Sequence, residues 1–132
     1  MKNTWKGLVA LQCAFAAATP ALAHHSGAMF DDTRNFEVQG VVQQWQWTNP
    51  HAWLQVTTVD AQGKTIVQGF ELGSPNTLVR SGYTLKSFVP GDKVTVIYHP
   101  RKDGTPGGEL GWAKDHDGKW LRWVTSYPMP TN

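Results

Sequence analysis

Short runs of alternating apolar and polar residues fill the chain between residues 36 and 124, and turn residues separate them. Such alternation is typical of half-buried β-strands. The pattern predicts strands over 36–47, 52–59, 66–72, 94–98, 109–114 and 119–124. The apolar positions expected to be buried together are Leu54, Val56, Ile66, Phe70, Leu72, Val94 and Val96. We therefore expect one strand-rich domain around one core.

A short helix is predicted between the third and fourth strands. Ser74 can cap this helix with Pro75 at its first position, and Gly82 can end it. Leu78 and Val79 are expected to face inward. The helix would be about two turns long.

The longest strand, 36–47, changes the parity of its apolar positions beside Gly40, which indicates a bulge or a sharp bend. A long bent first strand and a helix between strands three and four match the OB-type barrel. The predicted fold class is therefore all-β, a small OB-type barrel of five to six strands with one short helix. An open sandwich of the same strands is the alternative. Residues 24–35 are expected to form an extended strap before the barrel, 36–124, and 125–132 a flexible tail.

Residues 1–23 have the three-part pattern of a cleavable secretory signal. Lys2 and Lys6 precede an apolar run over 7–18, and Ala21-Leu22-Ala23 supplies the small residues of a cleavage site. A membrane anchor is the alternative, but spanning a bilayer takes about 20 apolar residues. We expect a periplasmic or secreted product that begins at His24 and does not insert into the membrane after cleavage.

Charge and motif content narrow the classes of function. The chain has 12 Lys and Arg against 10 Asp and Glu, and Lys2 and Lys6 lie in the signal, so the remainder is balanced. Without a basic cluster we expect no nucleic-acid binding, because phosphate neutralisation dominates that affinity. Cys13 also lies in the signal, and neither a G-x-S-x-G elbow nor a phosphate-binding glycine loop is present. The sequence thus favours a binding protein over an enzyme.

The histidines are the candidate metal ligands. If cleavage follows Ala23, His24 carries a free α-amino group beside its imidazole, and these two nitrogens can chelate one metal ion. His25 adds a further imidazole. Nitrogen-rich sites favour Cu(II), so copper is the predicted cofactor.

Two later histidines can join this site. His51 lies in the loop between the first two strands, and His99 ends the fourth strand. In an OB-type barrel the loops after strands one and four border the same cleft, so these imidazoles are expected to approach each other. His116, in the last hairpin, is expected to lie elsewhere. The structural alternative is that His51 holds its turn by hydrogen bonds and packs between tryptophans.

Four stretches carry a resemblance to a known family: HHSGAMFDD from residue 24, WTNPHAW from 47, FELGSPN from 70 and PGDKVTVIYHPRKDG from 90. With them the chain resembles small exported bacterial proteins of unknown function, the domain-of-unknown-function family numbered 6152, over nearly all of residues 24–124. The resemblance implies export and a compact β domain. That family has no established activity, so the resemblance implies no catalytic residues.

Three functions remain open. The first is an exported binding protein that takes copper through the mature N-terminal histidine. The second is a non-metal OB-type module that docks another envelope protein or a small ligand. The third is a copper-dependent oxidase, which additionally needs an open coordination position and a reductant.

Overall fold

The computed structural model describes residues 26–124, 126–128 and 130. A 3-10 turn, η1 (Ser26–Met29), precedes the strands, and a short helix, α1 (Pro75–Arg80), lies between the third and fourth of them. The strands are β1 (Phe36–Gln46), β2 (Trp53–Val59), β3 (Thr65–Glu71), β4 (Lys93–Pro100), β5 (Gly107–Lys114) and β6 (Trp120–Arg122). The predicted signal with its cleavage site, His24 and His25 lie outside the described residues.

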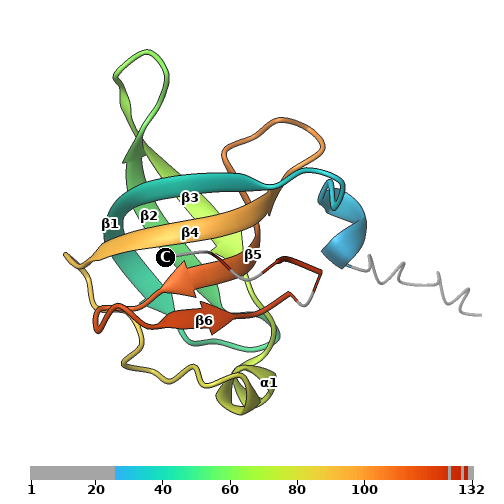
Figure 1. The fold of residues 1–132 in the computed structure, drawn as a ribbon, viewed down its shortest axis with the longest axis vertical. Coiled ribbons are helices and arrows are strands. Elements are labelled where there is room, and N and C mark those ends of the chain that lie inside the picture. Colours follow the sequence, from blue (N-terminus) through green and yellow to red (C-terminus); the bar gives the residue numbers. More distant parts are fainter. Residues whose placement is uncertain (1–25, 125, 129, 131–132) are drawn as a thin grey trace, which may run out of the picture.

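The strands pair in the order β3-β2-β1-β4-β5-β6, and a parallel pairing of β3 with β5 closes the first five into a barrel. Figure 1 shows the barrel with α1 below one end and β6 added beside β5. This closed barrel, with its helix between β3 and β4, is the OB-type fold that the sequence predicts. The open sandwich is excluded because β3 and β5 pair. No helix in the described part of the chain has the length and apolar character needed to cross a membrane.

Strand β1 is long and bent, and it pairs with β2 on one side and β4 on the other. Val41 pairs with Thr57 of β2 and with Lys93 of β4, and the register shifts between Val42 and Gln44. At Gly40 an added Cβ would lie 2.4 Å from the backbone oxygen of Thr57. The glycine thus marks a close approach of two strands, and the bulge follows it along β1.

The core contains six of the seven residues that alternation predicts: Leu54, Val56, Phe70, Leu72, Val94 and Val96. Ile66 is the exception, because it is only partly buried. It pairs with Thr58 near the β2–β3 turn, where the hairpin projects beyond the neighbouring strands (Figure 1). Alternation identifies the face of a strand but not where the barrel ends.

Helix α1 has the predicted start, with Ser74 as N-cap and Pro75 in the first turn, and it ends before Gly82, which has a φ of 86°. The Ser74 hydroxyl contacts the Thr77 hydroxyl at 3.0 Å instead of capping the backbone. Leu78 is buried, but the prediction for Val79 is wrong, since it is 61% exposed. A helix of six residues packs along one narrow face only.

Strand β5 begins earlier than the pattern predicts, at Gly107 instead of Glu109. Gly107 pairs with Gly69 across the parallel β3–β5 ladder, and an added Cβ would lie 2.2 Å from the Gly69 carbonyl oxygen. The φ of Gly107 is 100°, which L side chains rarely adopt. These glycines look like loop residues in the sequence, yet they let the barrel close.

Candidate functional site

His51 lies in the loop before β2, where its imidazole contacts a buried carboxylate. The Nδ1 atom forms an ion-pair contact with Oε1 of Glu71, the last residue of β3. The Glu71 side chain is 9% exposed, whereas that of His51 is 37% exposed. The Thr48 hydroxyl also donates a hydrogen bond to the His51 backbone oxygen at 3.1 Å. The Glu71 contact orients the ring, and the Thr48 bond holds the backbone of the loop.

A row of acidic and imidazole side chains continues from Glu71 across the outer surface of the barrel. Glu71 pairs with Glu109 of β5, and Glu109 pairs with His99 of β4. Residues paired directly across a ladder project on the same face of the sheet. His51, Glu71, Glu109 and His99 therefore form one row, which we call the His–Glu row.

His99, at the far end of the row, is held on both sides of its ring. It is 2% exposed. Its Nδ1 lies 2.9 Å from the backbone oxygen of Arg34, and its Nε2 lies 3.4 Å from the Ser126 hydroxyl. The ring also packs on Tyr127, with 4.0 Å between the centroids. Both imidazole nitrogens are thus engaged within the protein.

Glu109 sits in the middle of the row in an unfavourable environment for a negative charge. Burial raises the pKa of its carboxyl, and the charges of Glu71 and Asp32 raise this pKa further, while His99 opposes them. Burial and Glu109 in turn raise the pKa of the neighbouring Tyr127 phenol. The row therefore has the His51–Glu71 contact at one end and, at its centre, a Glu109 carboxyl whose pKa is raised.

This environment predicts that Glu109→Gln raises the melting temperature at neutral pH. A carboxyl whose pKa is higher in the folded state stabilises the fold while it is protonated, and this contribution is lost as the pH rises through the folded-state pKa. The advantage of the variant should shrink as the pH falls below about 4, where the carboxyl is protonated in both states. Thermal unfolding between pH 3 and 8 measures this difference. A variant less stable than the wild type at neutral pH would contradict the prediction, and Glu37→Gln, at an exposed position, is the control.

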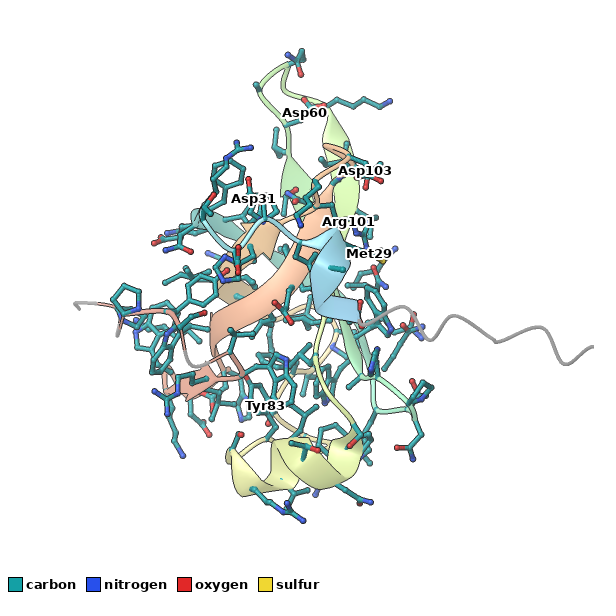
Figure 2. The ribbon with its side chains drawn as sticks, turned by 90° about the vertical axis from the view of Figure 1, so that its right-hand side faces the viewer. Met29, Asp31, Asp60, Tyr83, Arg101 and Asp103 are labelled. Carbon is teal, nitrogen blue, oxygen red and sulfur yellow. The ribbon has the colours of Figure 1, made fainter. Side chains whose placement is uncertain are left out.

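The segment before β1 lies at the end of the barrel that carries His99. The Asp31 backbone nitrogen donates to the Pro100 oxygen at 2.9 Å, and that of Lys102 donates to the Met29 oxygen at 3.0 Å. Phe30, which is 2% exposed, bridges to Arg101. Figure 2 looks onto this side of the molecule and shows η1 in front of the strands, near the labelled Met29, Asp31 and Arg101.

The four predicted ligands thus have different outcomes. His24 and His25 lie outside the described residues. His51 and His99 stand at the two ends of the His–Glu row, with Glu71 and Glu109 between them. Among residues 26–124 and the described part of the C-terminus, no three His, Cys, Asp or Glu side chains are grouped to hold a metal ion. His116 contacts Asp117 and the Ser87 carbonyl, outside the row.

Sequence reasoning missed Glu71, Glu109 and Tyr127. Glu71 stands beside Phe70 at the end of an apolar strand, and a charged residue in that position was the available signal. No sequence pattern marked Glu109 or Tyr127. Glu109 enters the row through the β3–β5 pairing and Tyr127 through its packing on His99, and both contacts join segments that are distant in the chain.

The fold and the row define a small OB-type barrel with a histidine–carboxylate face. The chain belongs to the family of unknown function DUF6152, whose model matches residues 13–110. That match includes the whole His–Glu row and ends within β5. Neither the comparison with curated proteins nor that with solved structures gives a match.

Proposed function

We propose that the mature protein is a periplasmic or secreted binding protein that holds one Cu(II) ion through His24 and His51. The α-amino group and the imidazole of His24 supply two nitrogens, and Nε2 of His51 supplies a third. His25 is the nearest additional donor. The observation that carries this proposal is the contact between Nδ1 of His51 and the buried Glu71 carboxylate.

That contact has the form of the outer-shell bond found at metal sites. A ligating histidine usually donates its second ring N–H to a carboxylate, which fixes the ring and raises the basicity of the ligating nitrogen. With Nδ1 on Glu71, Nε2 is left for a metal, and no described residue forms a hydrogen bond with it. His99 differs, because it is buried and both of its nitrogens are engaged. We therefore favour His51 over His99 as the ligand.

The position of the N-terminal segment also supports a site on the face that carries the His–Glu row. The described chain begins at Ser26, two residues after His24, and Asp32 is close enough to Glu109 to raise its pKa. Since no three described side chains are grouped around a point, the proposed site depends on nitrogens from residues 24 and 25.

Copper titration of the native protein and its His51→Gln variant tests this function. Glutamine can still donate a hydrogen bond to Glu71 but lacks the imidazole ligand, so the affinity for Cu(II) should fall by at least about tenfold, the loss typical when even an outer-shell partner is changed. His116→Ala is the matched control and should bind as the wild type does. Electron paramagnetic resonance should show nitrogen coordination in the native protein. Equal affinity of His51→Gln and wild type would remove His51 from the site.

Failure of the native protein to bind copper better than a histidine-free variant would overturn the metal function altogether. The non-metal interaction module would then be the better account of the fold. Reductant-dependent oxygen consumption by the copper-loaded protein would instead favour the oxidase.

A further inference from the structure

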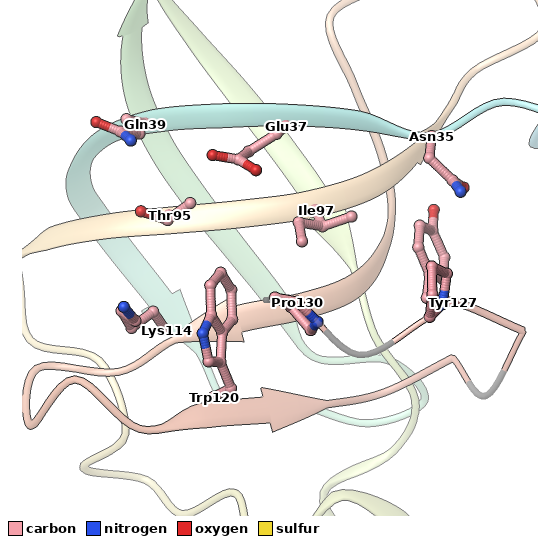
Figure 3. Close-up of a pocket in the computed structure, with 10 residues that line it drawn as sticks. Asn35, Glu37, Gln39, Thr95, Ile97, Lys114, Trp120, Tyr127 and Pro130 are labelled. Carbon is pink, nitrogen blue, oxygen red and sulfur yellow. The ribbon is translucent and has the colours of Figure 1, made fainter. Parts of the chain in front are cut away.

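A groove lies on the outer face of β1 and β4, on strands that carry neither Glu71 nor Glu109. Its volume is about 420 Å³, within the range of about 300–1,000 Å³ usual for small-molecule sites. Figure 3 shows Gln39 and Glu37 of β1 above Thr95 and Ile97 of β4, with Trp120 of β6 facing them. The strands thus form its floor, and β6 with residues after it forms a wall.

Polar side chains of several kinds line this groove without partners of their own. Asn35 and Gln39 offer amides, Thr95 a hydroxyl and Glu37 a carboxylate. None of these four side chains forms a hydrogen bond with another described residue. Amides and hydroxyls both donate and accept, and the carboxylate accepts at two oxygens. A ligand with many hydroxyl groups can satisfy such a mixed set.

The charge in the groove is balanced. Among the described residues that line this cavity, Lys114 is the one cation, and its ammonium lies 5.1 Å from the centroid of the Trp120 ring. Glu37 is the opposing anion. Anionic ligands such as nucleotides or phosphates would meet one cation and one carboxylate, which gives no net attraction. The half-buried indole adds an apolar surface for the C–H face of a ring.

The groove is also long. A second cavity of about 550 Å³ shares Gln39, Thr95 and Lys114 with the first and continues toward His116 and Gly118 in the β5–β6 hairpin. The two cavities are therefore neighbouring parts of one surface depression. An occupant that fills both parts is an extended chain of units.

We propose that this groove binds an uncharged oligosaccharide. The unpartnered amides, hydroxyl and carboxylate match vicinal hydroxyl groups, Trp120 provides a ring-stacking surface, and the length fits several sugar units. None of the four residues of the His–Glu row lines the groove, which adjoins the row where Tyr127 packs on His99. Trp120 and Tyr127, which form its wall, lie beyond the family match to residues 13–110. Because His51 does not line the groove, the proposed oligosaccharide binding does not require copper.

Nuclear magnetic resonance of the full chain, with maltotetraose, cellotetraose and tetra-N-acetylchitotetraose as probes, tests this site. At least one tetrasaccharide should shift the Trp120 indole signal saturably, and the disaccharide of the same series should bind at least about tenfold more weakly if several units contact the groove. Trp120→Ala should reduce the affinity by about tenfold or more, because a truncated aromatic anchor typically costs over 1 kcal/mol.

Two matched glutamine variants test the groove independently, in case Trp120→Ala does not fold. Gln39→Ala removes an exposed amide from the groove, and Gln55→Ala removes a half-buried amide from β2, outside the groove. The first should weaken binding and the second should not. The proposal is overturned if none of the three tetrasaccharides shifts the Trp120 signal, or if both glutamine variants weaken binding equally. It is also overturned if only a charged oligosaccharide, tested as tetragalacturonate, binds.

Discussion

Phe70→Ala is expected to lower the free energy of unfolding by about 3–5 kcal/mol, the range for truncating a buried phenylalanine. Phe70 has no exposed surface. Its ring lies 4.8 Å from that of Tyr98, and its backbone pairs with Leu54 on one side and Gly108 on the other. The substitution thus leaves a cavity at the seam where β3 and β5 close the barrel.

Urea unfolding followed by tryptophan fluorescence measures this loss. Val67→Ala is the matched control, because Val67 lies on the same strand with 45% of its surface exposed. Exposed substitutions usually change stability by within about 0.5 kcal/mol. A loss below about 1 kcal/mol for Phe70→Ala would mean that the surrounding core does not depend on this ring.

The fold was predictable because it depends on local patterns. Alternation identified the strands, and Ser74-Pro75 identified the start of α1. The order of these elements was enough to predict an OB-type barrel, since that topology places its one helix between β3 and β4. Local patterns failed where distant chain segments decide the outcome. Gly107 belongs to a strand because β3 approaches it, and Ile66 is partly exposed because the hairpin extends past its neighbours.

The candidate site was predictable in part for the same reason. The topology predicted that His51 and His99 approach each other, and the pairings place Glu71 and Glu109 between the strand ends that carry them. The sequence did not indicate that carboxylates would lie between them, because that depends on the register of a parallel pair 38 residues apart in the chain. Nor did it distinguish the partly exposed imidazole of His51 from the buried one of His99. Burial of a histidine depends on packing that no spacing reveals.

Acetylation of the α-amino group of His24 in the mature protein is expected to weaken Cu(II) binding by roughly a hundredfold, or about 2.8 kcal/mol. Acetylation converts this amine into an amide, supplies no new amine and leaves every side chain intact. It therefore removes one nitrogen of the chelate without changing the composition of the barrel. The imidazoles of His24 and His51 remain, but the amine and the imidazole of His24 no longer close a chelate ring on the metal.

Isothermal titration of Cu(II) into the native and acetylated proteins, both with their termini verified by mass, measures this difference. The control is native protein taken through the same treatment without the acetyl donor, and it should bind as the native protein does. The double variant His24→Ala/His25→Ala should also bind weakly, because it keeps the amino group but loses both neighbouring imidazoles. Equal affinity of the acetylated and native proteins would show that the α-amino group is not a ligand. Copper bound to such a protein would then have to be held by side chains alone, and the described part of the chain offers no group of three for it.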